Sequence, residues 1–188
     1  MNEEITLGQK TFKNTTISSA SRVTWDSKIL KIPSMGDLLL GQIVSVSEKI
    51  ATVLVSLIIR IIKDGNLEEI RLLKLPGPTH AYIFKGDVKF PCVNLSDILK
   101  LGDLVLGRVK VDWFKPVFLS LDTEDTGVVS GICSNCGAVL PTPRDLASNT
   151  LVCPRCKSTR KTKVSKLYEP IIWREIHLTN RIQTLPPA

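Results

Sequence analysis

The chain has 188 residues, of which 43% are hydrophobic and 23% are charged, a composition that suits one medium-sized domain or two to three small ones. Its apolar runs are too short or too interrupted to span a bilayer, and its polar, acidic N-terminus has neither a secretory nor a transit signature. We therefore expect a cytoplasmic protein with no membrane contact. The formal net charge of +7 favours a polyanionic partner.

This positive charge is concentrated in the last third of the chain. Residues 127–168 hold seven Lys or Arg against one Asp, a net of +6, whereas residues 36–122 hold eleven Lys or Arg against ten Asp or Glu, a net of +1. A clustered basic excess is typical of a surface that meets a polyanion. A solvated basic face without a partner is the alternative.

Residues 1–35 are not expected to form an independent domain. They are polar and rich in Ser, Thr and Asn as far as the phrase VTWDSKILKI, which predicts a short strand or hairpin. We expect Trp25 in this phrase to pack on the domain that follows.

Residues 36–122 carry a repeated pattern that predicts a small β-barrel. The phrases GDLLLGQIVSV and GDLVLGRVKVD each open with a Gly-Asp turn and continue as an apolar run interrupted by one glycine, Gly41 or Gly107. An interior glycine in a strand marks a bulge or sharp bend, which suits a closed barrel. The predicted strands cover residues 38–46, 49–62, 80–92, 103–112 and 116–121.

Five strands, with a short helical turn at NLSDILK before the fourth, are typical of an OB-type barrel. Any other small all-β barrel or sandwich is the alternative. The segment between the second and third predicted strands, residues 63–79, is long for a hairpin and has a Pro-Gly-Pro centre, so it is expected to be a surface loop. Cys92 stands alone in an apolar run and is expected to be a buried, inert thiol.

Residues 128–168 contain two C-x-x-C pairs separated by sixteen residues: Cys133, Cys136, Cys153 and Cys156. Two residues between ligands let one tight turn direct both thiolates at the same metal, and the sixteen-residue spacer is long enough for a hairpin that joins the two turns. We predict one structural Zn²⁺ held by four thiolates in a zinc ribbon, with a redox dithiol pair as the alternative. A left-handed residue is expected after each pair, at Gly137 and Lys157.

The strand after the second pair reads RKTKVSKLY, and its side chains alternate between two faces that are both polar or basic. This pattern predicts an exposed strand that meets an anion. The candidate polyanion-binding residues of this unit are Arg155, Arg160, Lys161, Lys163 and Lys166.

Residues 169–188 form a C-terminal tail in which IIWREIHL predicts a strand or a docking segment. No catalytic set is found: neither His80 nor His177 lies near a nucleophile motif, and the sequence has no phosphate-binding loop or dinucleotide fingerprint. We therefore expect a protein that is not an enzyme.

The junction LSLDTEDTGVVSGICSNCGAVL, together with MGDLLLGQIVSV, LKLGDLVLGRV and LVCPRC, resembles the Csl-four type RNA-binding cap subunit of the archaeal RNA exosome. The resemblance covers roughly residues 32–168. It implies an S-one-like OB barrel at residues 36–122 and a zinc ribbon at residues 128–168. Residues 1–35 would be a reduced form of the docking domain of that family.

The resemblance also implies a function that involves no catalysis. Cap subunits of this family sit on the degrading ring, guide single-stranded RNA into it, and help to recruit an archaeal primase-like protein. The expected partners are therefore exosome ring subunits, single-stranded RNA and such a primase-like protein.

Two alternative functions use the same predicted barrel and zinc ribbon but bind a different partner. Residues 1–35 lack the Pro-Gly-Glu or Pro-Gly-Asp phrase that opens the docking domain of the family, which favours a diverged relative on another ribonucleoprotein such as the ribosome. A basic face that meets an acidic protein would instead make the chain a protein-interaction adaptor.

Base stacking by the barrel would need exposed aromatic residues, of which the chain has few. Trp113 and Phe114 are two candidates. Tyr82, Phe84 and Phe90 share one parity along the third predicted strand, and a place in the barrel core is the favoured interpretation for them. The candidate RNA-binding residues of the barrel are Tyr82, Phe84 and Lys89.

Overall fold

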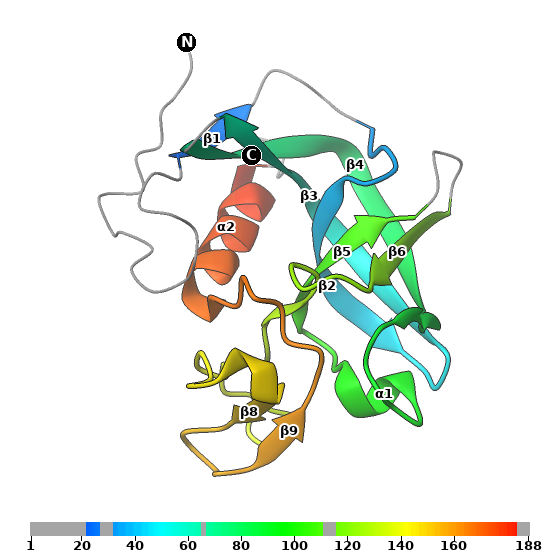
Figure 1. Ribbon diagram of the computed structural model, residues 1–188, viewed down its shortest axis with the longest axis vertical. Helices are drawn as coiled ribbons and strands as arrows, with labels where there is room; N and C mark the ends of the chain where they lie inside the picture. The colour runs from blue at the N-terminus through cyan, green and yellow to red at the C-terminus, as the bar shows by residue number, and fades with distance from the viewer. Residues whose placement is uncertain (1–21, 27–31, 65–66, 111–115, 184–188) are drawn as a thin grey trace.

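The computed structural model describes residues 22–26, 32–64, 67–110 and 116–183 (Figure 1). Its strands are β1 Arg22–Asp26, β2 Leu38–Val46, β3 Ile50–Asp64, β4 Leu67–Val88, β5 Leu104–Val109, β6 Val117–Leu121, β7 Gly127–Ser130, β8 Thr150–Val152 and β9 Thr159–Lys161. Its helices are α1 Leu95–Ile98 and α2 Pro170–Gln183, with a 3-10 turn at Leu146–Ser148.

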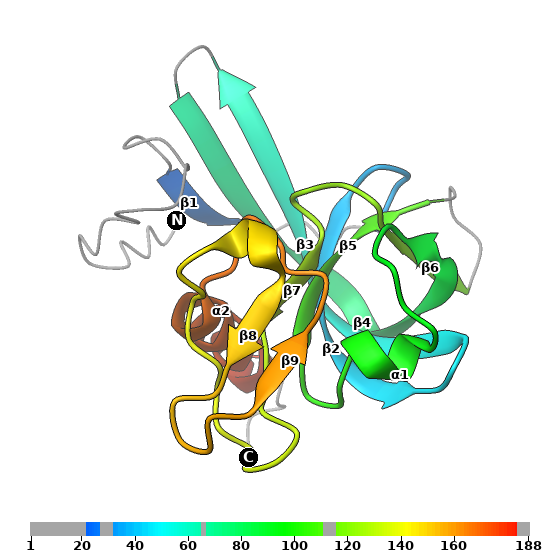
Figure 2. The same ribbon diagram turned by 60° about the horizontal axis from the view of Figure 1, so that its bottom comes forward.

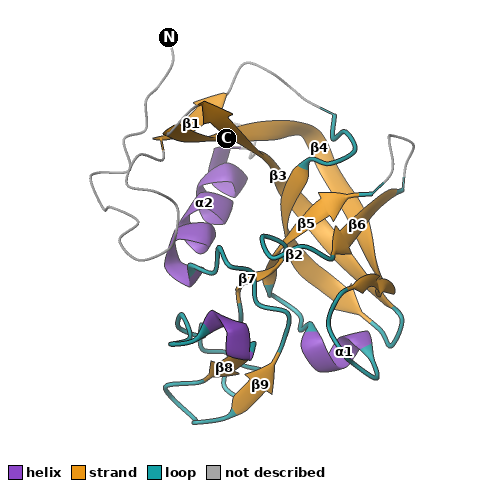
Figure 3. Ribbon diagram, in the orientation of Figure 1, coloured by secondary structure: helices purple, strands orange, loops and turns teal. Residues whose placement is uncertain are grey.

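Five of these strands close into a barrel (Figure 3). The ring runs β4–β3–β2–β5–β6 and closes through a parallel pairing of β6 with β4, in which Val117 lies opposite Ala81. The other neighbours in the ring are antiparallel. The predictions of a mainly β fold, of a short helical turn at α1 and of a strand within VTWDSKILKI are confirmed; that strand is β1, which pairs with β4.

The predicted surface loop at residues 63–79 is wrong. β3 continues to Asp64 and β4 begins at Leu67, so the two strands form one long hairpin that projects beyond the barrel (Figure 2). Ile59 lies opposite Leu72, and both side chains are buried. Such cross-strand apolar pairs stabilise an extended hairpin over a loop.

The predicted strand at IIWREIHL is also wrong, because this segment belongs to helix α2. Trp173 and Ile176 are spaced by three residues and share one helix face, where they are 4% and 5% exposed. They pack on the outside of the barrel against leucines of β2 and β5, so the segment docks within its own chain (Figure 1). His177 Nδ1 lies 2.6 Å from Ser56 Oγ of β3 and adds a polar contact to this interface.

Strands β2 and β5 are apolar on both faces because both faces are covered. Leu39 and Val105 belong to the cluster of buried residues inside the barrel, whereas Leu38, Leu40 and Leu106 belong to the cluster beneath α2. This arrangement explains why the sequence has unbroken apolar runs, LLL in β2 and LVL in β5.

Gly41 allows β2 to bend at an irregularity in its pairing with β3. The register between β2 and β3 shifts at Leu40/Gly41, and a Cβ at Gly41 would lie 2.4 Å from Val53 Cγ1. Any side chain there would clash with β3. The bulge or bend predicted at this glycine is confirmed.

The cysteine-bearing residues 128–168, called the cysteine unit from here on, pack directly on the barrel. β7 pairs with β5, Val128 forms a parallel bridge with Val164, and β8 pairs with β9. One cluster of buried residues joins Leu140 and Leu151 to the barrel interior. The cysteine unit therefore shares a core with the barrel.

No helix among the described residues is both long enough and apolar enough to cross a membrane.

Candidate metal centre and exposed aromatic surface

The two cysteine pairs form two turns with the same backbone hydrogen bonds. In the first, the Gly137 N–H donates to Cys133 O at 2.9 Å; in the second, the Lys157 N–H donates to Cys153 O at 3.0 Å. Gly137 and Lys157 have φ values of 71° and 61°, so the left-handed residue expected after each pair is confirmed. Each turn therefore directs its two cysteines to the same side.

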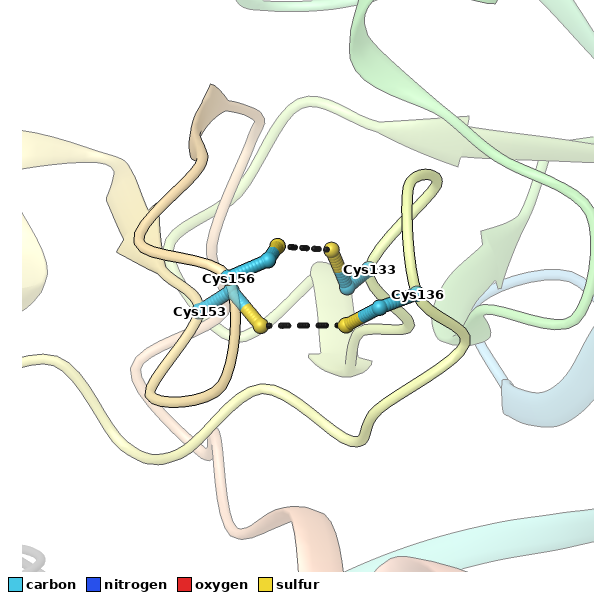
Figure 4. Close-up of side chains that lie close together, drawn as sticks. All are labelled: Cys133, Cys136, Cys153 and Cys156. Carbon is cyan, nitrogen blue, oxygen red and sulfur yellow. Dashed lines mark hydrogen bonds between the residues drawn. The ribbon is translucent and has the colours of Figure 1, made fainter.

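The four sulfur atoms face one another across the gap between the two turns (Figure 4). Cys133 Sγ lies 3.5 Å from Cys156 Sγ, Cys136 Sγ lies 3.4 Å from Cys153 Sγ, and all four sulfurs lie within 4.8 Å of one another. Four sulfurs at about 2.3 Å from one tetrahedral centre would be about 3.8 Å apart, so the cluster fits one metal ion. A disulfide would need sulfurs about 2.0 Å apart, and all four cysteines are free thiols.

Ser158 stabilises the thiolate form of two of these cysteines. Its Oγ lies 3.0 Å from Cys156 Sγ and 3.2 Å from Cys133 Sγ. Hydrogen bonds from its hydroxyl and backbone lower the pKa of Cys156 to about 5, and the same hydroxyl lowers the pKa of Cys133. Because the thiolate is the metal-binding form, this environment favours metal binding by Cys133 and Cys156. The pKa of Cys136 is raised to about 12, because the effect of the Ala138 backbone hydrogen bond is outweighed by the neighbouring Cys153 sulfur and by burial. The sequence analysis missed Ser158, a hydroxyl residue that directly follows the second turn.

Arg160 is not an exposed residue, contrary to the sequence prediction. Its guanidinium forms an ion pair with Asp103 of the barrel, and the two side chains are 8% and 0% exposed. Its Nη1 lies 3.1 Å from Asp103 Oδ1 and also donates to Ile132 O at 2.9 Å. Burial raises the pKa of Asp103, against the opposing effect of the Arg160 charge. The ion pair between Arg160 and Asp103 therefore links the cysteine unit to the barrel.

Lys163 is also buried, because backbone carbonyl oxygens accept hydrogen bonds from its ammonium group. Its Nζ donates to Thr123 O at 2.7 Å and to Thr126 O at 3.0 Å, in the segment that leads from β6 to β7. Burial lowers the pKa of Lys163, while nearby acidic residues, Asp125 first among them, raise it. Of the predicted strand RKTKVSKLY, only Arg160 and Lys161 belong to a strand, β9, and residues 162–165 are buried. The prediction of an exposed basic strand is wrong for this part.

The other predicted basic residues lie on the surface. Arg155, Lys161 and Lys166 of the cysteine unit are exposed, and so is Lys89, which follows β4. The structure thus keeps these four on the surface and assigns Arg160 and Lys163 to internal contacts.

Tyr82 and Phe84 lie on the outer face of the barrel, not in its core. Their neighbours Ala81 and Ile83 are fully buried, whereas Phe84 is 38% exposed and Tyr82 is half-buried. The period-two alternation of β4 therefore points these two aromatic rings outward, and the favoured interpretation from the sequence is wrong.

Phe118 of β6 joins Tyr82 and Phe84 in a cluster of three aromatic side chains, called the aromatic face from here on. Its ring centroid lies 6.4 Å from that of Tyr82 and 5.5 Å from that of Phe84. The sequence analysis missed Phe118, although it alternates with the buried Val117 and Leu119.

A shallow groove of about 480 Å³ adjoins the aromatic face and is lined by Phe84, Lys49, Lys85, Glu48 and neighbouring residues. Lys49 and Lys85 are exposed. Phe90 is not part of the aromatic face; it follows β4 and is half-buried against the barrel core. Trp113, Phe114 and the side chain of Trp25 lie outside the described residues.

No protein-family model matches the sequence, and no match was found among curated proteins.

Proposed function

We propose that this protein is a non-catalytic RNA-binding adaptor that holds single-stranded RNA on the aromatic face of its barrel. The observation that carries this proposal is the cluster of Tyr82, Phe84 and Phe118 beside exposed lysines. Aromatic rings stack on bases regardless of base identity, and lysines bind the phosphate backbone, so such a surface suits single strands without strong sequence preference.

The ring order of the barrel supports its identity as an OB-type fold. In chain order the barrel strands are β2, β3, β4, β5 and β6, and the third pairs in parallel with the fifth. The helical turn α1 lies between the third and the fourth. OB folds bind oligonucleotides on the surface of their second and third strands, here β3 and β4, and β4 carries Tyr82 and Phe84 of the aromatic face.

We further propose that the four cysteines hold one structural Zn²⁺, so that the cysteine unit is a zinc ribbon. Four thiolates at tetrahedral spacing match the ligand preference of zinc and leave no open position for a substrate. Zinc would contribute folding energy to a unit with few apolar residues of its own.

The assembly that fits this arrangement is a cap on the archaeal RNA exosome in the cytoplasm, in which the protein guides single-stranded RNA to the ring subunits. A primase-like protein is a further proposed partner. Ribosome binding by a diverged relative and a purely protein-binding adaptor are the alternatives. Affinity purification with and without ribonuclease separates them: exosome subunits retained after ribonuclease support the cap, and ribosomal proteins support the first alternative.

Direct RNA binding is tested by titrating a fluorescent single-stranded oligouridylate. Replacing Phe84 by Ala is expected to weaken binding by about 1–3 kcal/mol, because one base loses its stacking partner. The matched control is Ile171→Ala, which removes an exposed apolar side chain of helix α2 that lines neither the aromatic face nor its groove. Equal affinities of the parent and the Phe84 variant would contradict the proposal.

A further inference from the structure

A second groove, called the junction groove from here on, lies between the barrel and the cysteine unit. It has a volume of about 690 Å³. Phe90, Cys92 and Lys100 line it on the barrel side, and Ser134, Thr159 and Lys161 line it on the side of the cysteine unit.

Polar contacts that involve two lining residues, Ile98 and Arg160, join the two walls of the junction groove. Thr162 Oγ1 donates to Ile98 O at 2.6 Å, and the Arg160 guanidinium forms its buried ion pair with Asp103. The groove therefore forms where the cysteine unit packs on the barrel, and these contacts set the separation between its two walls.

The charge of the junction groove suits an anion. Arg160 lines it but is neutralised by Asp103, which leaves Lys100 and Lys161 against one carboxylate, Asp97. Lys100 Nζ donates to Ser96 O at 2.6 Å and keeps its positive charge, because that partner is neutral. That carboxylate already accepts the Asn94 N–H at 2.9 Å. Lys161 is exposed and forms no ion pair within the described ranges, and hydroxyl groups such as that of Thr159 add neutral donors. Ammonium and hydroxyl donors along a groove match the oxygens of a phosphodiester chain.

The junction groove also meets the groove beside the aromatic face. Cys92 lines the first, and the next residue, Val93, lines the second together with Phe84 and Lys85. Val93 is 77% exposed, so this stretch of chain forms a ridge shared by the two grooves. An extended polymer that leaves the aromatic face across this ridge enters the junction groove.

We propose that one RNA strand binds in both places, with its bases on the aromatic face and its phosphodiester backbone continuing into the junction groove on Lys100 and Lys161. This inference rests on the RNA-binding function proposed above. In this arrangement the cysteine unit contacts the RNA directly, because it lies beside the barrel.

The test compares oligouridylates of about 4 and about 16 nucleotides, the limits of the length that one OB-type fold spans. Replacing the half-buried Lys100 and the exposed Lys161 by Gln is expected to leave the short strand unaffected and to weaken the long strand about threefold to tenfold, the range for two solvent-screened charge contacts. The salt slope for the long strand should fall by about 1.4, because each phosphate contact to a single strand contributes about 0.7. The matched control replaces Arg144 and Lys157, exposed basic residues outside the groove, by Gln and should change neither value.

A second measurement needs no substitution. Cys92 is a half-buried free thiol in the groove wall, so its alkylation rate, read by peptide mass spectrometry on the metal-loaded protein, reports whether the groove is filled. The long strand is expected to slow this alkylation, and the short strand is not.

The outcomes separate this inference from the function on which it rests. If neither strand binds the parent protein, both proposals are wrong. If both strands bind, but the groove variant matches its control and the long strand leaves Cys92 alkylation unchanged, only the junction groove assignment is wrong. Protection of Cys92 by an oligoglutamate peptide and not by the long strand would likewise overturn it, in favour of an acidic protein.

Discussion

Arg160 and Lys161 are adjacent basic residues with opposite environments. The Arg160 guanidinium is buried against Asp103, whereas the Lys161 side chain points into solvent. Sequence alone gave both the same expected role, because a strand alternation predicts two faces but not which face is covered. The deciding interaction comes from Asp103, which lies 57 residues away in the chain.

Replacing Arg160 by Leu is expected to destabilise the protein by about 3–5 kcal/mol, because the buried Asp103 carboxylate loses its counter-charge. Urea denaturation measures the change. The matched control, Lys161→Leu, should stay within about 0.5 kcal/mol of the parent. The double variant Asp103→Leu with Arg160→Leu should recover part of the loss, since it leaves no unpaired charge; equal stabilities of the parent and the Arg160 variant would contradict the structural role.

Tyr168 connects two segments of the cysteine unit through its hydroxyl. The hydroxyl accepts the Gly131 N–H at 3.0 Å and donates to Leu140 O at 2.9 Å, and the ring is fully buried. Tyr168→Phe is expected to cost about 1–3 kcal/mol near neutral pH, because both backbone groups lose their partner. Thermal denaturation of the two proteins at one pH measures this cost.

The same residue predicts a specific alkaline sensitivity. Burial raises the pKa of Tyr168 from 10.0 to about 12, so the folded state holds this proton more tightly than the unfolded state does. Its contribution to stability is complete below pH 10.0 and is lost as the pH rises towards about 12. The stability difference between the parent and Tyr168→Phe should therefore shrink over this interval. If the stability difference between the two proteins stays constant across this pH interval, the pKa of Tyr168 is not raised in the folded state.

Helix α2 supplies the cover for the second apolar face of β2 and β5. Trp173→Ala should cost about 3–5 kcal/mol, since a large buried side chain is removed from the cluster with Leu38 and Leu40. Leu178→Ala on the same helix is the control: this side chain is 56% exposed, and its loss should change the stability by less than about 0.5 kcal/mol. Chemical denaturation of both variants tests the assignment, and similar losses would mean that α2 does not dock as described.

The elements that sequence analysis predicted correctly are those with a local signal. Gly-Asp turns and interrupted apolar runs located β2 and β5, and the cysteine spacing located the two cysteine-bearing turns. The sequence carries conflicting signals at the β3–β4 hairpin, because Pro-Gly-Pro at residues 76–78 favours a surface loop, whereas Asp64-Gly65 is a turn signal typical of a hairpin. Helix α2 was missed because a short apolar run with two β-branched residues fits either a strand or a helix.

At the scale of the whole molecule, the barrel and the cysteine unit are expected to unfold together. Cys133 and Cys153 are 4% and 0% exposed and belong to the same buried cluster as Leu39 inside the barrel. Arg160 and Tyr168 therefore stabilise one shared core, and a metal ion bound by the four cysteines would stabilise the same core. This coupling could not be predicted from the sequence, since it depends on how two separately recognisable motifs dock.

Purified protein is expected to contain about one zinc per chain, and Cys153→Ser should lose it, because three thiolates leave the tetrahedral site incomplete. The thermal transition of the whole chain should then move to a lower temperature as a single step, since the core is shared. Elemental analysis and calorimetry provide the two measurements. Cys92→Ser is the control and should keep its zinc; full zinc retention in the Cys153 variant would contradict the site.

The close approach of Gly127 to the cysteine unit restricts which substitutions this chain can accept during evolution. A Cβ at Gly127 would lie 2.5 Å from Lys163 O, and its φ of 131° is strained for any other residue. Asp103 and Gly127 belong to the barrel side of the interface, while Arg160 and Lys163 belong to the other. A cysteine unit transplanted onto a different barrel would lack these counterparts. We therefore expect the four positions to vary as a set among related sequences, and the exposed Arg155 and Lys166 to vary independently of them.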